Sequence, residues 1–293
     1  MQGSREISTT ARKLVKGVDK LVSLPEVCFL VNDLVNDPLS DIEDIGHVIS
    51  QDPDLTARLL KLVNSSYYGF PQRIETVTRA ILMVGLKELQ NMVWASSAVE
   101  TFSKLPPKQI NMASFWRHSI FTAVVGRILA RECNVLHPER MFVAGLLHEI
   151  GRMLFYIKAP KQAARILEAE EEAPDRDVTL IEQEILGMDH AEVAAALFEQ
   201  WNFPPSLIEA VQFHHQPALA DEFALEAAIL NVANVMAHAL ESGEEDTLQD
   251  SCDPHAWKLL NIPDHRVKRI LHEAVLQFLE ALELLLPGAS QKV

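Results

Sequence analysis

Cysteine is scarce in this chain, and no apolar run is long enough to cross a membrane. The three cysteines, Cys28, Cys133 and Cys252, lie far apart and never form a CxxC pair. Their spacing excludes a disulfide framework and a zinc ribbon, so we expect buried thiols. The first residues are not followed by the apolar core of a secretory signal, and no segment reaches the ~18 apolar residues of a membrane-spanning helix. We therefore expect a cytoplasmic protein that does not engage membranes.

The alternating apolar pattern of β-strands is also missing. Hydrophobic residues make up 48% of the 293 residues, enough for a large core, and they recur at spacings of three and four. This period predicts an all-α fold of one or two domains. We expect helices at about residues 8–20, 24–36, 41–50, 54–63, 75–83, 86–101, 113–132, 138–157, 160–171, 178–186, 190–201, 205–214, 223–240, 254–260 and 264–286.

The segment Leu105-Pro106-Pro107 predicts a boundary between two helical lobes. Ten of the eleven histidines follow this segment, and only His47 precedes it. Prolines favour loops and helix starts, so we expect an N-terminal lobe at residues 1–105 and a second lobe at residues 106–293, closed by C-terminal capping helices.

The charge of the chain is unevenly distributed. Residues 1–110 carry 12 Lys and Arg against 13 Asp and Glu, whereas residues 111–293 carry 14 against 28, and the whole chain has a net charge of -15. An acidic surface repels phosphate backbones and anionic lipids, which argues against nucleic-acid or membrane binding by the second half. The nearly neutral first half remains open to partners of either sign.

A set of histidines on helical segments forms the main candidate site. A histidine among apolar helix positions points inward, so residues from several helices can converge on one metal pocket. For any single histidine a packing role is the simpler interpretation. The candidates are His118, His148, Glu149, His190, His214 and His215, with Asn234 at the edge. We expect His47, His137, His238, His255, His265 and His272 to be surface or packing residues.

Five segments of the chain resemble the HDOD domain family. They are residues 49–69, 74–92, 115–119, 144–151 and 187–193, and the resemblance extends from about Leu21 to His215. It implies a bacterial signalling module with two helical lobes, of which the second is similar to the HD-superfamily phosphohydrolases. HDOD modules, unlike those phosphohydrolases, generally lack a demonstrated enzymatic activity, so the resemblance does not imply catalysis.

The same resemblance implies which residues would bind metal. HD proteins use an early histidine, a His-Asp pair and a late aspartate, which match His118, the pair His148-Glu149, and Asn234. Histidines like His190, His214 and His215 complete a two-metal site in one branch of the superfamily. Glu149 and Asn234 stand where aspartate is expected. An imidazole-rich set with one carboxylate suits iron, zinc, nickel or manganese.

Two functions remain open from these residues. The first is a non-catalytic HDOD signalling scaffold with a degenerate metal pocket, acting through a partner protein or a small signal. The second is a metal-dependent phosphohydrolase acting on a nucleotide or a phosphodiester. Glu149 would displace a carboxylate by about 1 Å and Asn234 removes one, which favours the scaffold.

A loop rich in aromatic residues, from Asn64 to Pro71, is a second candidate for function. Its three aromatic rings, Tyr67, Tyr68 and Phe70, could form a patch that binds a partner protein. We expect them instead to fill the gap between neighbouring helices and anchor the loop.

Overall fold

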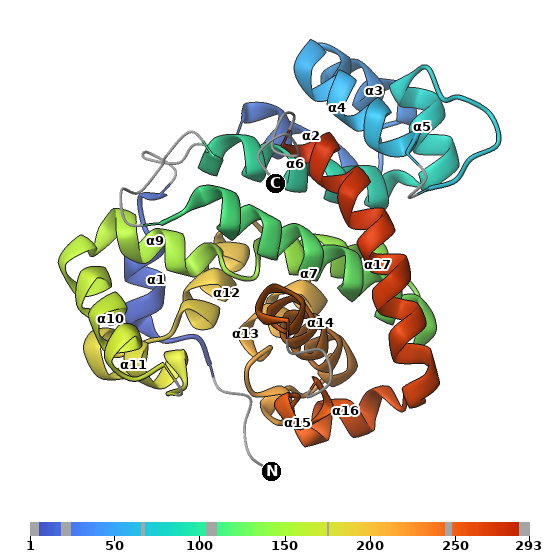
Figure 1. The fold of residues 1–293 in the computed structure, drawn as a ribbon. Coiled ribbons are helices and arrows are strands. Elements are labelled where there is room, and N and C mark those ends of the chain that lie inside the picture. Colours follow the sequence, from blue (N-terminus) through green and yellow to red (C-terminus); the bar gives the residue numbers. More distant parts are fainter. Residues whose placement is uncertain are drawn as a thin grey trace. The chain divides into compact units, whose positions relative to one another are not determined.

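The computed structural model describes residues 6–18, 25–65, 68–103, 110–174, 176–243 and 248–286. Within these ranges every regular element is a helix and no strand occurs, which confirms the all-α prediction (Figure 1). None of the described helices is long and apolar enough to span a membrane. The α-helices are α1 (Thr9–Val15), α2 (Glu26–Asn36), α3 (Ile42–Ser50), α4 (Pro53–Val63), α5 (Val77–Val84), α6 (Leu86–Ser103), α7 (Met112–Glu132), α8 (Glu139–Leu147), α9 (Ile150–Lys158), α10 (Pro160–Glu172), α11 (Val178–Leu186), α12 (His190–Gln200), α13 (Pro205–Gln212), α14 (Ala224–Ser242), α15 (Leu248–Ser251), α16 (Pro254–Leu260) and α17 (Asp264–Leu285).

The chain divides into two compact units. One unit combines residues 1–21 with 106–271, and the other combines 22–105 with 272–293. One boundary between the units lies after residue 105, where the sequence predicts a boundary between lobes. Each unit also includes a terminal segment from the other side of this boundary. The Leu105-Pro106-Pro107 segment itself lies outside the described residues. The two lobes expected at residues 1–105 and 106–293 therefore remain a prediction.

Helix α7 lies at the centre of the first unit and packs against α8 and α14. Its residues are apolar on nearly all sides and most are buried, which is typical of a core helix. The approach of α8 depends on Gly145, because a Cβ atom there would lie 2.6 Å from the Cα atom of Ala123 in α7. Helix α1 packs against α12 although they are far apart in sequence, and the Ser8 amide donates to Glu192 Oε1 at 2.6 Å.

The second unit is organised around α6, which contacts α2, α4 and α5. The side chain of Arg58 in α4 links two of these helices: its Nε donates to Ser96 Oγ at 2.9 Å, and its Nη2 lies 2.7 Å from Glu100 Oε2. A partly buried arginine that reaches two partners fixes the direction in which α4 crosses α6.

The aromatic loop belongs to this second unit. The hydroxyl of Tyr68 donates to Glu88 Oε1 at 2.6 Å, and its ring stacks on Phe70 with centroids 5.9 Å apart. Tyr68 and Phe70 are only partly exposed, as an anchoring role would require. Tyr67 lies outside the described residues.

One helix prediction was wrong at the most important place. Residues 138–157 were expected to form a single helix, but α8 ends at Leu147 and α9 begins at Ile150. The backbone of Glu149 leaves the helical region, with φ -87° and ψ 2°. Neighbouring residues of a continuous helix point in different directions, so this break allows His148 and Glu149 to face the same pocket. Neither proline nor an internal glycine marks the break in the sequence.

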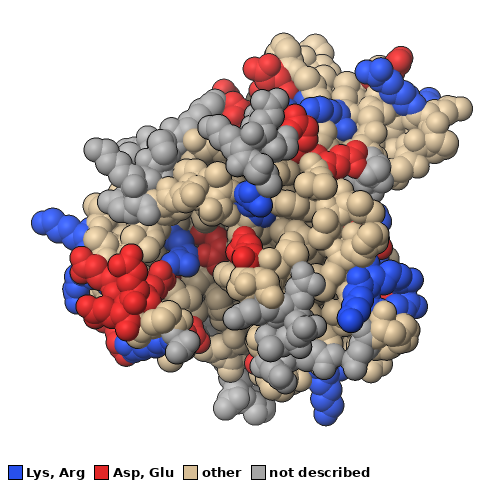
Figure 2. Space-filling view, in the orientation of Figure 1, with Lys and Arg blue, Asp and Glu red and all other residues tan. Residues whose placement is uncertain are grey.

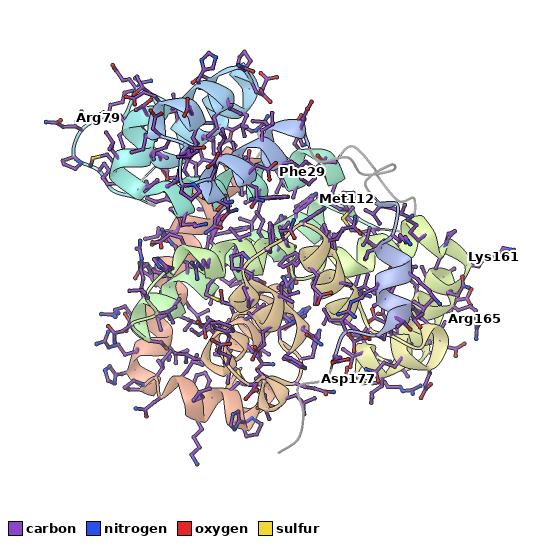
Figure 3. The ribbon with its side chains drawn as sticks, turned by 180° about the vertical axis from the view of Figure 1, so that it is seen from behind. Phe29, Arg79, Met112, Lys161, Arg165 and Asp177 are labelled. Atoms are coloured by element: carbon purple, nitrogen blue, oxygen red, sulfur yellow. The ribbon has the colours of Figure 1, made fainter. Side chains whose placement is uncertain are left out.

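Helix α10 covers α9 and α11 with one face only. Ala163 and Ile166 are buried, whereas Lys161 and Arg165 are exposed and project away from the unit (Figure 3). The helix is therefore amphipathic, and its buried face closes one side of the unit that contains the histidines.

Candidate metal centre

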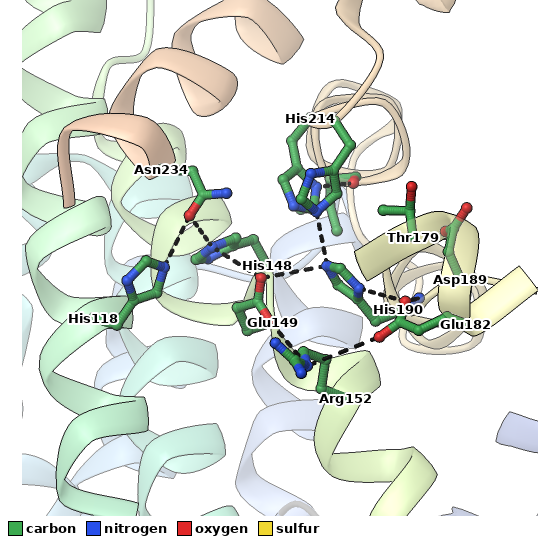
Figure 4. A network of polar contacts seen from close by, with 12 residues as sticks. His118, His148, Glu149, Arg152, Thr179, Glu182, Asp189, His190, His214 and Asn234 are labelled. Atoms are coloured by element: carbon green, nitrogen blue, oxygen red, sulfur yellow. Dashed lines mark hydrogen bonds and ion pairs between the residues drawn. The ribbon is translucent and has the colours of Figure 1, made fainter. Parts of the chain in front are cut away.

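The structure brings all six predicted site residues together within the first unit (Figure 4). His118 comes from the middle of α7, and the pair His148-Glu149 occupies the break between α8 and α9. His190 is the first residue of α12, and the pair His214-His215 follows α13. Three of the five histidines, His148, His190 and His214, are fully buried. Residues that span about a hundred positions thus form one cluster.

Two of these histidines have a tautomer that is fixed by backbone oxygens. Nδ1 of His148 lies 2.7 Å from the carbonyl oxygen of Gly145, and Nδ1 of His214 lies 2.7 Å from that of Val211. A carbonyl oxygen can only accept, so each Nδ1 carries the hydrogen and each neutral ring leaves the lone pair on Nε2. Nε2 of His214 is buried and has no hydrogen-bond partner among the described residues. An unpartnered, buried lone pair of this kind suits a metal ligand.

His190 is oriented by a buried carboxylate. Glu182 Oε2 accepts from the His190 backbone amide at 2.8 Å and lies 2.7 Å from its Nδ1. Asp189 is the N-cap of α12, and its side chain accepts from the Glu192 amide at 2.8 Å. The chain approaches closely here, since a Cβ on Gly151 would lie 2.0 Å from the His190 carbonyl oxygen. These contacts direct Nε2 of His190 into the cluster, 2.9 Å from Nε2 of His215.

Glu149 stands between two groups of possible ligands. Its Oε1 lies 3.6 Å from Nε2 of His148 and 3.3 Å from Nε2 of His190. Glu149, His190, His214 and His215 could hold one ion, and His118, His148 and Glu149 could hold another. The carboxylate belongs to both groups, so it can serve as a bridge in spite of its extra methylene.

Asn234 lies on α14 with its side-chain oxygen inside the cluster. Oδ1 is 2.9 Å from Nε2 of His118 and 3.3 Å from Nε2 of His148. The tautomer of His148 leaves its Nε2 without a hydrogen, so Nε2 cannot donate a hydrogen bond to this oxygen. Two atoms with lone pairs at this distance are well suited to share a cation.

The electrostatics separate the cluster into neutral and charged members. Burial opposes ionisation of Glu149, but the charge of His190 outweighs it and holds the pKa of Glu149 well below its usual range. Burial also opposes a charge on His190, yet Glu149 and Glu182 raise its pKa well above the usual value. Burial lowers the pKa of His148 and His214, so both rings stay neutral, whereas an ion bound by His190 would have to displace its proton.

Sequence reasoning missed the roles of Arg152, Glu182, His238 and Glu241 in the site. Arg152 lies 3.9 Å from Glu149 and 3.8 Å from Glu182, and it pairs with Glu170 at 2.5 Å. His238 was expected on the surface, and its side chain is 64% exposed, but its ring centroid lies 4.4 Å from that of His118. Glu241 Oε2 lies 3.3 Å from Nδ1 of His118.

Of these residues, only His238 and Glu241 could have been predicted from the sequence. His238 follows Asn234 by four positions, and Glu241 follows it by seven, so all three share one face of α14. Helical spacing from Asn234 could therefore have identified them. The other predicted surface histidines, His47, His137, His255, His265 and His272, are exposed.

A cavity of about 590 Å³ reaches the cluster from the surface. Part of its lining is apolar and includes Phe115, Tyr156, Leu167 and Val178. The rest includes histidines and charged residues of both signs, among them His118, Glu149, Arg152, His215, His238 and Glu241. Figure 2 shows this face hollowed, with acidic and basic side chains together at the hollow. A small molecule could therefore reach ions held in the cluster.

Comparison with known proteins assigns a family. The sequence pattern of the HDOD domain matches residues 21–217. The chain belongs to the HDOD domain family. An uncharacterized protein of Treponema pallidum is 28% identical to it over 245 residues, which are 80% of this chain and 46% of that protein. The uncharacterized protein YuxH of Bacillus subtilis is 23% identical over 142 residues, 34% of its length. The chain thus spans half or less of the length of these curated relatives.

Solved structures share the HDOD fold with this chain. A protein of Shewanella amazonensis, provisionally named a phosphohydrolase, matches with a TM-score of 0.72 and 28% identity over 93% of this chain and 96% of its own. An HDOD domain protein of unknown function from Geobacter sulfurreducens matches with a TM-score of 0.74 and 21% identity over 95% and 98%. A protein of Marinobacter aquaeolei, provisionally named a signal-transduction protein, matches with a TM-score of 0.69 and 20% identity over 96% and 65%.

Proposed function

We propose that this HDOD protein is a signalling scaffold whose histidine cluster holds a divalent transition metal and does not turn over a substrate. The observation that carries the proposal is Asn234, whose neutral oxygen lies 2.9 Å and 3.3 Å from two histidine nitrogens. At this position the resemblance to HD proteins implies an aspartate. An amide oxygen can ligate an ion, but it neutralises no charge and cannot accept a proton from an attacking water at neutral pH.

Glu149 supports the same conclusion. Its carboxylate is nearly buried and is surrounded by His148, His190 and Arg152. The low pKa that results makes Glu149 a stable anion and a weak general base. The group suits a ligand that holds ions in place better than a residue that activates water.

The donor atoms indicate which metals fit. Imidazole nitrogens outnumber carboxylates in both groups of possible ligands, which favours iron, zinc, nickel or manganese over magnesium or calcium. A bound ion would bring α7, α9, α12 and α14 together at one point. Because binding to the native state stabilises it, metal would make the fold of this unit more rigid.

The scaffold would act through another protein. The net charge of -15 disfavours nucleic acid, and the family relatives include a protein provisionally named for signal transduction. We propose a partner protein that recognises the metal-loaded conformation.

A metal-dependent phosphohydrolase is the second candidate. The cavity that leads to the cluster favours it, because a scaffold has no need of a path for substrate. The Shewanella amazonensis protein with 28% identity is provisionally named a phosphohydrolase. Two ions bridged by Glu149 could activate water for attack on a phosphodiester or a nucleotide.

Metal analysis and a turnover screen distinguish the two. The purified protein and His148→Ala would be analysed for bound iron, zinc, nickel and manganese, and then screened against nucleotides and cyclic dinucleotides. The scaffold predicts metal in the wild type, less in His148→Ala, and no turnover above background in either. Metal-dependent hydrolysis that disappears in His148→Ala would establish the phosphohydrolase instead.

A further inference from the structure

Three side chains that line the cavity form a second cluster, which shares His118 with the buried ligands. His118 comes from α7, whereas His238 and Glu241 lie one turn apart on α14. Glu241 Oε2 lies 3.3 Å from Nδ1 of His118 and 3.9 Å from Nδ1 of His238. The His238 and Glu241 side chains are 64% and 46% exposed, so solvent reaches them directly.

The geometry of this cluster is that of an incomplete metal site. Ligand atoms that surround a tetrahedral ion at about 2.0–2.1 Å stand roughly 3.3–3.5 Å apart. The 3.3 Å between Glu241 and His118 matches this spacing, and the 3.9 Å between Glu241 and His238 exceeds it by about 0.4 Å. One atom from each of the three residues lies within 4.8 Å of the other two. Two histidines and one carboxylate leave a coordination position open to water. The donors suit zinc, nickel or cobalt.

The ring of His118 can serve this cluster or the buried one. When Nε2 carries the hydrogen, it can donate to Asn234 Oδ1 at 2.9 Å, and the lone pair of Nδ1 faces His238 and Glu241. When Nδ1 carries the hydrogen, it can donate to Glu241, and Nε2 is free toward His148. A neutral imidazole has one free lone pair, so an ion on either side of the ring competes for it.

We infer that His118, His238 and Glu241 form an outer site for a divalent transition metal, from which ions load the buried cluster. The two groups line the same cavity and share His118, so an ion that leaves the outer site has a short path inward. The loading role rests on the proposed metal pocket, whereas the outer site itself does not. The buried ligands hold ions tightly, and the exposed site exchanges them rapidly.

Cobalt binding to the full chain tests both parts. The protein would be stripped with a chelator and mixed rapidly with Co²⁺, whose visible absorption reports each ion as it is bound. His238→Ala removes a ligand of the outer site alone, and Glu241→Gln removes the outer carboxylate, which also contacts the shared ring of His118. His214→Ala changes only the buried cluster, and His255→Ala is the control for loss of an exposed histidine. The wild type should show a fast, weak phase followed by a slow, tight phase.

The variants have distinct expected results. His238→Ala and Glu241→Gln should lose the fast phase and slow the second phase by about tenfold or more, with the same final amount of tightly bound cobalt. His214→Ala should keep the fast phase, and His255→Ala should match the wild type. An unchanged fast phase in His238→Ala, or its loss in His214→Ala, would overturn the outer site. A fast phase without any tight phase in the wild type would refute the buried metal pocket and leave the outer site standing.

Discussion

Glu182 offers the most specific test of how the site is built. Its side chain is fully buried on α11, and one oxygen accepts from both the backbone amide and Nδ1 of His190, at 2.8 Å and 2.7 Å. Glu182→Gln keeps the size and an acceptor oxygen, but it removes the charge. We therefore expect His190 to remain in place and to become a weaker ligand.

The size of the effect follows from these two contacts. A hydrogen bond to a charged group contributes roughly 1.5–3 kcal/mol, so loss of the charge should lower the free energy of unfolding by about 2 kcal/mol. In a protein of this size such a loss lowers Tm by roughly 4–8 °C. Replacing a carboxylate that supports a histidine ligand typically weakens metal binding roughly 10–100-fold. Glu182→Ala, which leaves the buried amide without a partner, should cost about 3–5 kcal/mol.

Thermal unfolding and metal titration of matched variants measure both quantities. Glu184→Gln is the control, because Glu184 lies on the same helix, is 63% exposed and pairs with Arg176 at the surface. We expect it to change stability by less than about 1 kcal/mol, with unchanged metal affinity. Equal behaviour of Glu182→Gln and Glu184→Gln would refute the positioning role of Glu182.

Three further outcomes are expected. Gly151→Ala should lower Tm and weaken metal binding while helical circular dichroism persists, because the new Cβ would lie 2.0 Å from the His190 carbonyl oxygen; an unchanged Tm would contradict this close contact. Denaturant unfolding of the metal-free protein should show greatest stability near pH 6.5. Below it the unfolded chain binds protons that His148 and His214 reject, since burial lowers their pKa. Above it the unfolded chain releases a proton that native His190 keeps, because two carboxylates raise the pKa of His190 against burial, so this stabilisation is lost as the pH rises; stability that still rises from pH 6.5 to 8 would be inconsistent. Burial raises the pKa of the Cys28 thiol to about 12, so this thiol should resist alkylation at pH 8 until the protein is unfolded. Rapid labelling of Cys28 in the native protein would contradict its burial.

Much of the fold could be predicted from helical periodicity and punctuation. The helix expected at about residues 190–201 is α12, His190–Gln200, and Asp189 caps its first turn. The position of the break after Leu147 could not be predicted, because the flanking Gly145 and Gly151 lie within α8 and α9 and no proline directly follows Leu147. It results from tertiary packing that gives both His148 and Glu149 a place in the pocket.

The ligands were easier to predict than the residues that support them. His118, His148 and His190 stand out because each is a polar residue on an apolar helix. Glu182 resembles any other acidic residue in the sequence, and its role appears only when the turn between α11 and α12 places it beside His190. Glu241 lies 123 residues from His118, so their contact depends on the packing of α14 against α7.

Anomalous X-ray diffraction from metal-loaded crystals tests the central claim most directly. Data would be collected at the absorption edge of the metal that the purified protein contains, or of added Zn²⁺ if it contains none. The account predicts a strong peak within about 2.0–2.2 Å of Nε2 of His214 or of His148, with Glu149 as a common ligand. Crystals saturated with metal that show no peak at these nitrogens would contradict the account.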